Sequence, residues 1–327
     1  MSAGSDFGGN MKKTGLLLTL CLVAAAAAQQ TASPSPATPD GTLATSVSFP
    51  LERVETPTHA DLYCAGFVNK DRLPNANFVA GGLNTPTTAQ YAEGDIVYLS
   101  GKGYELGKRY TIVRELRDPN RYEIFPGQSA MLKAMGQPYA ELATVRVVDT
   151  RGRSTVAHVE FSCAPMVPGD IVTSFVEKEK VSFHPPLRFD RFVPANGKLG
   201  GRIVMARDFD TELGTGNKVY LNFGANQGVK VGDYFRAVRS YEADLRDPVD
   251  SLSFKASTAE DTQANPPSIE QKMFTRTNGP SIHVSDFPRR AVGEIVIVST
   301  TPTTSTGMIV FAMEDIYIGD GVELDQQ

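Results

Sequence analysis

The chain has 327 residues, of which 41% are hydrophobic and 21% are charged, so it contains enough apolar material for one or two packed domains. Acidic residues outnumber basic ones by 37 to 32 and the pI is near 5.5, which argues against a partner recognised through its nucleic-acid backbone. The strongly apolar run lies near the N-terminus, and this pattern excludes a multi-span membrane protein.

The N-terminal region is typical of an export signal. Met11, the expected natural start, is followed by two lysines, an apolar stretch from Leu16 to Val23 and a run of alanines ending at Ala28. We therefore expect residues 1–28 to comprise a short extension and a signal peptide cleaved after Ala28. The apolar stretch is too short to cross a bilayer, so no transmembrane span is expected after cleavage. Lipid attachment at Cys21 stays open as an alternative, although a leucine directly precedes this cysteine.

A linker is expected between the signal and the folded body. Residues 29–58 are rich in Pro, Ser, Thr and Ala and show neither a period of two nor a period of 3.6 in their apolar positions. Such a composition predicts a disordered segment. An export signal followed by this linker predicts a protein of the periplasm or cell envelope.

An internal repeat organises the rest of the chain. Residues Glu141 to Val172 align without a gap on Ala291 to Val322, and Phe161 matches Phe311. Apolar residues recur at every second position in both copies, which a helix cannot bury on one face. Each copy therefore predicts a β-hairpin followed by a turn that leads into another strand.

A second correspondence extends the repeat towards the N-terminus. Asp95 to Arg114 resembles Asn217 to Arg239, and both segments contain the tripeptide VYL. We therefore predict an all-β protein of two tandem small SH3-like β-barrel or sandwich modules related by internal duplication. The predicted divisions are β module 1 at 59–176, a connector at 177–198, and β module 2 at 199–327 with a long polar insertion at 240–290.

Four Gly-Asp pairs punctuate the predicted strands. Glycine reaches positive φ, and aspartate bonds neighbouring backbone amides in a turn, so these pairs favour a structural rather than a catalytic function. They are Gly94-Asp95, Gly169-Asp170, Gly232-Asp233 and Gly319-Asp320.

Two cysteines, Cys64 and Cys163, remain after the proposed cleavage. An even pair in an exported protein predicts a disulfide. The alternative is a buried free thiol, because the period-two pattern places Cys163 on the inward face with Val159 and Phe161.

Two further clusters are weaker candidates for sites. Asp208, Asp210 and Glu212 alternate as in a calcium loop, but the sixth position lacks the required glycine, so we expect a polar hairpin tip, no metal site and no cofactor. The connector carries a strip of aromatic and basic residues that we expect to seal the junction between the two modules, with a partner-docking strip as the alternative. This strip consists of Arg188, Phe189, Arg191 and Phe192.

The strand and turn pattern also resembles a known family. The segment NKVYLNFGANQGVKVGDYFRAVRS and the later AVGEIVIVSTTPTTSTGMIVFAMEDIYIGDGVEL are similar to the C-terminal module of LysM-containing cell-envelope proteins, and more distantly to the C-terminal domain of flagellar assembly protein T. The resemblance implies a small β-barrel, an extracytoplasmic location and a role in binding or assembly, with no catalytic residues to transfer. The chain has no recognisable LysM segment.

These observations predict an exported, non-enzymatic binding or assembly protein of the bacterial cell envelope. The expected partner is an envelope protein or a cell-wall glycan. Sequence motifs of metalloproteases, P-loop proteins and serine hydrolases are missing. Two alternatives stay open. One is a structural subunit or accessory of a flagellar, pilus or secretion assembly, and the other is a hydrolase whose site is assembled from sequence-distant residues.

Overall fold

The computed structural model describes residues 56–85, 89–119, 122–182, 189–192, 194–240 and 286–325. The predicted signal peptide, almost all of the predicted linker, most of the predicted insertion at 240–290 and Arg188 lie outside these residues. The described part belongs to one compact unit, Thr45–Gln327. As predicted, it is an all-β protein with two tandem barrels of six antiparallel strands each.

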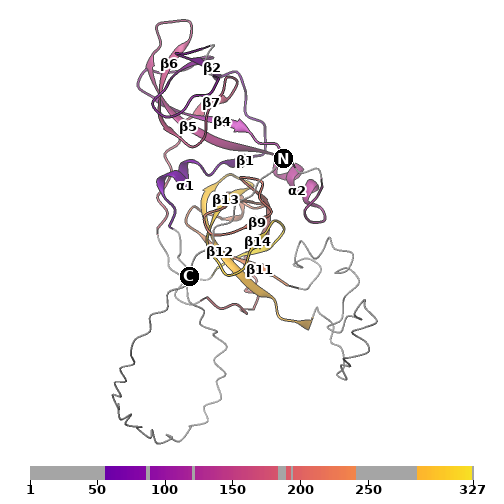
Figure 1. Cartoon of the computed structure of the whole chain (residues 1–327). Coiled ribbons are helices and arrows are strands. Elements are labelled where there is room, and N and C mark those ends of the chain that lie inside the picture. Colours follow the sequence, from indigo (N-terminus) through magenta and orange to yellow (C-terminus); the bar gives the residue numbers. More distant parts are fainter. Residues whose placement is uncertain are drawn as a thin grey trace, which may run out of the picture. The chain divides into compact units, whose positions relative to one another are not determined.

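The first barrel is built by the predicted module 1 (Figure 1). Its strands run in the order β5-β4-β7-β2-β3-β6, and β6 pairs with β5 to close the barrel. Strand β1 pairs with the first residues of β5. The elements of this module are α1 (His59–Tyr63), β1 (Phe67–Asn69), β2 (Phe78–Gly82), β3 (Ile96–Ser100), β4 (Arg109–Glu115), α2 (Gln128–Met135), β5 (Gln137–Asp149), β6 (Thr155–Ser162) and β7 (Ile171–Ser174).

The second barrel closes in the order β10-β13-β12-β11-β15-β8. A short ribbon of β9 and β14 accompanies it. The elements of this module are β8 (Gly200–Ala206), β9 (Glu212–Leu213), β10 (Lys218–Leu221), the 3₁₀ turn η1 (Ala225–Gln227), β11 (Tyr234–Arg239), β12 (Arg290–Thr300), β13 (Ser305–Ala312), β14 (Ile316–Tyr317) and β15 (Gly321–Leu324).

The two barrels have the same topology. Numbered along the chain, the six barrel strands of each module follow the circular order first, second, fifth, fourth, third, sixth. Their strand registers also agree, since Val97 pairs with Ala157 as Val219 pairs with Gly307. The repeat found in the sequence is therefore a repeat of structure, down to the pairing of individual residues.

The β-bulges of the two barrels also coincide. The pairing of β5 with β6 shifts between Thr144 and Val145, and that of β12 with β13 shifts between Glu294 and Ile295. A bulge inverts the alternation of side chains beyond it. The expectation that Phe161 and Cys163 share the inward face of Val159 is therefore wrong. Phe161 pairs directly with Thr144, on the outside of the barrel.

All four Gly-Asp pairs form the same tight turn. Each glycine has φ between 88° and 104°, and each aspartate accepts a hydrogen bond from the backbone N–H three residues before it. Their equivalence across the repeat follows the aligned segments of the sequence. Gly94 donates to the Val159 carbonyl as Gly216 donates to that of Ile309, so Gly94-Asp95 corresponds to Gly216-Asn217.

The outer faces of the barrels have diverged. In barrel 2, Val296, Val298, Met308 and Val310 form a buried apolar cluster with Leu62 of α1 and with Ala65. The corresponding positions of barrel 1 are Arg146, Val148, His158 and Glu160, a mostly polar set. Helix α1 thus covers barrel 2 with its apolar side, and this burial is worth roughly 25 cal/mol per Å² of apolar surface.

A second element of module 1 also packs on barrel 2. Helix α2 lies in the connection between β4 and β5, and its Met135 belongs to a buried cluster with Val204 and Tyr220. Val204 sits at the bulge where β8 has one residue more than β10, and Gln128 Nε2 donates to its carbonyl at 2.9 Å. Neither helix was predicted, because both are short and their burial depends on the other barrel.

Candidate functional site

Helix α1 is attached to both barrels, to barrel 2 through Asp61 and to barrel 1 through the disulfide that follows the helix. Thr58 and Asp61 form a capping box that starts the helix, and the Asp61 carboxylate also pairs with Lys218 of β10. Burial alone raises the pKa of Asp61, but hydrogen bonds from Lys218 and Thr58 outweigh it and hold the pKa below its usual range. Asp61 is therefore a charged anchor between this short helix and barrel 2.

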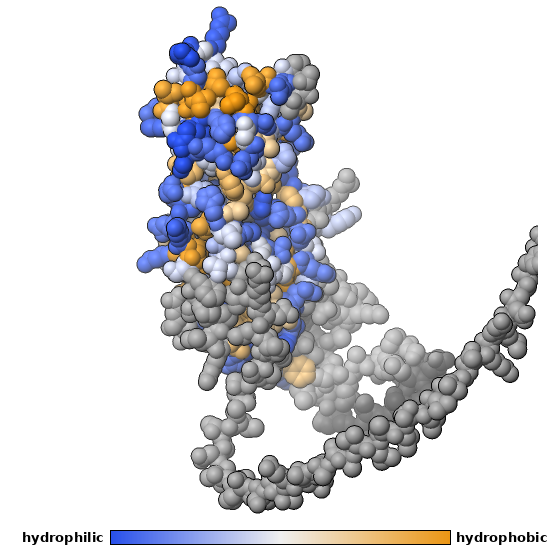
Figure 2. Space-filling view, turned by 60° about the vertical axis from the view of Figure 1, so that its left-hand side comes forward, coloured by the Kyte–Doolittle hydropathy of each residue, from blue (hydrophilic) through white to orange (hydrophobic). Residues whose placement is uncertain are grey.

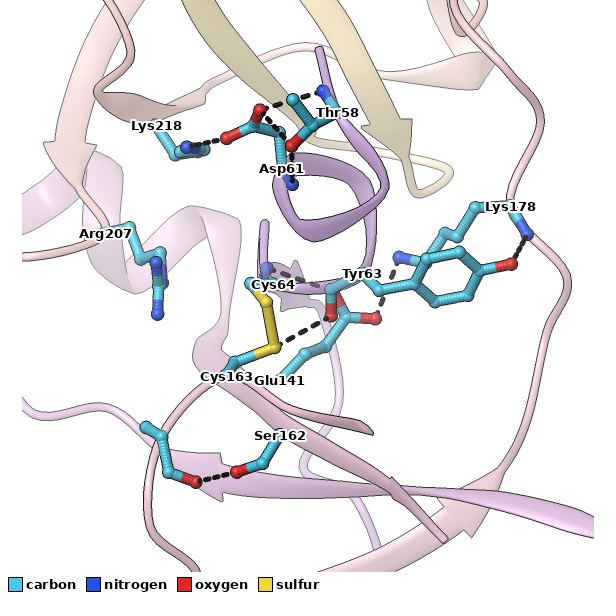
Figure 3. Close-up of a disulfide and its surroundings, with 12 residues drawn as sticks. Thr58, Asp61, Tyr63, Cys64, Glu141, Ser162, Cys163, Lys178, Arg207 and Lys218 are labelled. Carbon is cyan, nitrogen blue, oxygen red and sulfur yellow. Dashed lines mark hydrogen bonds and ion pairs between the residues drawn. A yellow bond between two sulfur atoms is a disulfide. The ribbon is translucent and has the colours of Figure 1, made fainter. Parts of the chain in front are cut away.

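The predicted disulfide fastens the other end of α1 to barrel 1 (Figure 3). Cys64 directly follows the helix, Cys163 directly follows β6, and their Cα atoms lie 5.6 Å apart. Next to the disulfide, Glu141 accepts from the Gly66 N–H at 3.1 Å and pairs with Lys178 at 2.8 Å. Gly66 has φ of 70°, and a Cβ there would collide with Tyr220 and with the Tyr139 carbonyl. The chain after α1 is thus held in one path.

A pocket of about 290 Å³ lies beside this fastening, on the outside of barrel 1. Four aromatic side chains line it, namely His59, Tyr63, Phe161 and Phe175. Its polar lining comes from Arg109, Thr144, Glu160 and Glu177. Strands β4, β5 and β6 thus supply one side of the pocket. The chain after β7 supplies another side, and α1 supplies the rest of the lining.

The aromatic rings of the pocket contact one another. The His59 ring stacks on Tyr63 with centroids 4.4 Å apart and meets Phe161 edge-on at 5.0 Å. Tyr63 in turn stacks on Phe175 at 5.7 Å, and the Arg109 guanidinium lies 5.6 Å from the Phe175 centroid. Aromatic faces and a neighbouring guanidinium are well suited to bind a planar or ring-shaped group.

The charges around the pocket are paired. Glu160 accepts from Arg109 Nε at 2.8 Å and also from Arg146. Burial raises the pKa of Glu160, but the two guanidinium groups outweigh it and lower the pKa below the usual range. Burial raises the pKa of Tyr63, whose hydroxyl donates to Glu177 at 3.2 Å. At neutral pH the pocket therefore offers a carboxylate with both oxygens occupied and a neutral phenol.

Another cavity, of about 310 Å³, lies at the far end of β4. Arg114, Arg117 and Asp170 contribute to its lining. Arg114 is engaged with Asp170 through two hydrogen bonds of 2.7 Å, and the same pairing recurs in barrel 2. This recurrence indicates that the pair is part of the barrel architecture.

The structure places the strip of aromatic and basic residues on barrel 2. The Phe189 ring lies 5.0 Å from that of Phe311, and Arg191 pairs with Glu314, so both are packed onto the barrel. Phe192 is exposed. Arg188 lies outside the described residues.

The weak calcium candidate does not form a cluster. Among the residues that the structure describes, no group of three His, Cys, Asp or Glu side chains is arranged to hold a metal ion. Asp208 lies 3.8 Å from the guanidinium of its neighbour Arg207, and Glu212 belongs to the β9 ribbon. Asp208, Asp210 and Glu212 therefore give no reason to place a cation here.

The pocket residues were missed by sequence reasoning. His59, Tyr63 and Phe175 lie outside every motif of the sequence. The sequence did contain one sign of the pocket. Phe161 matches Phe311 in the repeat, and an aromatic residue at the same position of both copies indicates the same role in both barrels. The bulge that turns it outward is not visible in the sequence.

The comparisons with known proteins assign no family. No protein-family model matches the chain, and no curated protein matches it. No helix of the described residues is long and apolar enough to cross a membrane.

Proposed function

We propose that this chain is an exported binding protein of the bacterial cell envelope and that it binds its ligand in the aromatic pocket of barrel 1. The observation that carries the proposal is the Cys64–Cys163 disulfide, which fastens the helix that closes the pocket. Structural disulfides form and persist in oxidising compartments and are rare in the cytosol. The export signal expected at residues 11–28 is consistent with such a compartment.

The carboxylate of Glu160 is suited to orienting a ligand and not to proton transfer. A general acid or base needs an accessible group whose pKa lies near the working pH. Glu160 instead has a lowered pKa, and its oxygens are taken by Arg109 and Arg146. Rings and paired charges supply contact surface and orientation for a ligand. An envelope protein and a cell-wall glycan both offer matching groups.

Export is tested by the mature protein itself. The chain of residues 1–327, expressed in a Gram-negative host, is expected in the periplasmic fraction with Gln29 as its first residue. Intact-mass measurement after alkylation, with and without reductant, should show that Cys64 and Cys163 are bonded. Retention of the whole N-terminal segment in the cytoplasm, with two free thiols, would contradict the proposal.

Binding is tested by two capture assays run in parallel. Tagged mature protein is incubated with a periplasmic extract and, separately, with purified peptidoglycan sacculi. A retained partner or cosedimentation with sacculi is expected to be lost in Phe175→Ala. Leu106→Ala is the matched control, because Leu106 is 67% exposed on the same barrel but does not line the pocket. Equal capture by both variants would exclude this pocket as the binding site.

A further inference from the structure

We propose that the pocket of barrel 1 takes an aromatic side chain from a partner polypeptide, with a basic residue close to that side chain. This inference rests on the proposed function and specifies its ligand. Its basis is that barrel 2 already binds an aromatic side chain at the corresponding place, supplied by this chain. Barrel 2 therefore shows an aromatic side chain bound at the place that corresponds to the pocket of barrel 1.

The correspondence is fixed by strand register. Phe161 pairs with Thr144, and Thr144 pairs with Thr111 on the next strand. In barrel 2, Phe311 pairs with Glu294, and Glu294 pairs with Arg236. These two rows occupy the same positions on the outside of the two barrels, so what covers one row shows what the other can accept.

Barrel 2 carries Phe189 on this row. The Phe189 ring meets the Phe311 ring at 5.0 Å with an interplanar angle of 65°, and the Arg236 guanidinium lies 5.9 Å from its centroid. The neighbouring backbone is held as well, because the Arg191 carbonyl accepts from the Ala291 N–H at 2.7 Å. Phe189 belongs to the connector that precedes β8, so the aromatic side chain that covers this row is not part of the barrel itself.

Barrel 1 has room on the same row. His59 meets Phe161 at 5.0 Å, but the pocket beside it reaches Thr144, the counterpart of Glu294. Its volume of about 290 Å³ is near the lower limit of roughly 300–1,000 Å³ for small-molecule sites. This size fits one side chain better than a large ligand.

The charge next to the pocket favours a basic neighbour. Glu177 is exposed and lines the pocket, where it accepts a hydrogen bond from the Tyr63 hydroxyl. In barrel 2, Phe189 is followed by Arg191, whose guanidinium pairs with Glu314. An aromatic residue with an arginine two positions later therefore matches both the rings and the acidic edge of barrel 1.

A peptide copied from the connector tests this inference. The probe is the fluorescein-labelled peptide LRFDRFV, residues 187–193, titrated against the oxidised mature protein by fluorescence polarisation. Saturable binding is expected, with an affinity about tenfold lower or worse when Phe189 of the peptide is replaced by alanine. Phe175→Ala in the protein should weaken binding similarly, and Leu106→Ala should not.

Three outcomes would overturn the inference. The first is equal affinity for LRFDRFV and its Phe189→Ala version. The second is a loss of binding in Phe311→Ala but not in Phe175→Ala, which would show that the peptide exchanges with the connector on barrel 2. The third is Phe175-dependent binding of soluble muropeptides without any binding of the peptide. This last result would keep the proposed function and replace the polypeptide ligand by a glycan, whereas failure of both probes and of the capture assays would reject both proposals.

Discussion

Arg239 donates two parallel hydrogen bonds to the carboxylate of Asp320, from Nε at 2.8 Å and from Nη2 at 2.7 Å. Arg114 and Asp170 repeat this arrangement in barrel 1 with two bonds of 2.7 Å. In each barrel the pair joins the end of the third strand to the Gly-Asp turn before the sixth. The Arg–Asp pair thus helps to close each barrel.

The two pairs differ in burial, and this difference predicts unequal effects of the same substitution. The Arg239 side chain is 3% exposed, whereas the Arg114 side chain is 40% exposed. Asp320→Asn should lower the free energy of unfolding by about 3 kcal/mol because it removes the carboxylate that accepts both parallel hydrogen bonds of the buried guanidinium and leaves Glu314, 3.7 Å away, as its ion-pair partner. Asp170→Asn should cost only about 1 kcal/mol, since water screens Arg114. Urea denaturation of the two variants measures this, and equal losses would contradict the role given to burial.

The pair illustrates how far the sequence leads. Arg114 and Arg239 end the two aligned segments, and Asp170 and Asp320 match in the repeat, so the recurrence was visible. The all-β fold, the two barrels and the disulfide were also predictable, because alternation, repetition and an even cysteine count are local or countable signals. The outward turn of Phe161 and the closing of the pocket by α1 depend on a one-residue bulge and on contacts with another barrel, which no local pattern records.

Reduction of the disulfide should destabilise the protein. The bond closes a loop with a sequence separation of 99 residues, and the loop-entropy model gives a contribution of roughly 4–5 kcal/mol for this length. Cys64→Ala/Cys163→Ala should therefore unfold at a lower urea concentration than the oxidised protein. The oxidised protein treated with reductant is the matched comparison, and it should approach the double variant. A denaturation midpoint unchanged by either treatment would show that packing alone holds α1 in place.

Glu294 should make stability depend on pH. It is 2% exposed, and burial is the largest cause that raises its pKa from the ordinary 4.5 to about 7, with Asp325 adding to the shift and Arg236 opposing it. Between these two values the folded protein holds a proton that the unfolded chain has released, so stability falls as pH rises from about 4.5 through 7.

Glu294→Gln isolates this effect. The stability of the variant relative to the wild type should be greater at pH 8, where the buried carboxyl is charged, than at pH 5 by about 1–3 kcal/mol. Chemical denaturation at pH 5, 6, 7 and 8 measures the difference. A difference that stays constant over this range would show that the pKa of Glu294 is the same in the folded and in the unfolded protein.

The buried hydroxyl of Thr306 should contribute to the attachment of the segment after α1 to barrel 2, beside that of Thr304, which donates to the Val68 carbonyl at 2.8 Å. Thr306 Oγ1 donates to the Gly66 carbonyl at 3.0 Å, and Thr306 is 2% exposed. Thr306→Val keeps the shape of the side chain but leaves that carbonyl without this donor, at a cost of about 1–3 kcal/mol. Thr306→Ser is the matched control, because it keeps the hydroxyl and loses only a methyl group, at a cost of roughly 1 kcal/mol. The valine variant should therefore be the less stable of the two in urea denaturation. The reverse order would show that the methyl packing of Thr306, and not its hydrogen bond to Gly66, holds the segment on the barrel.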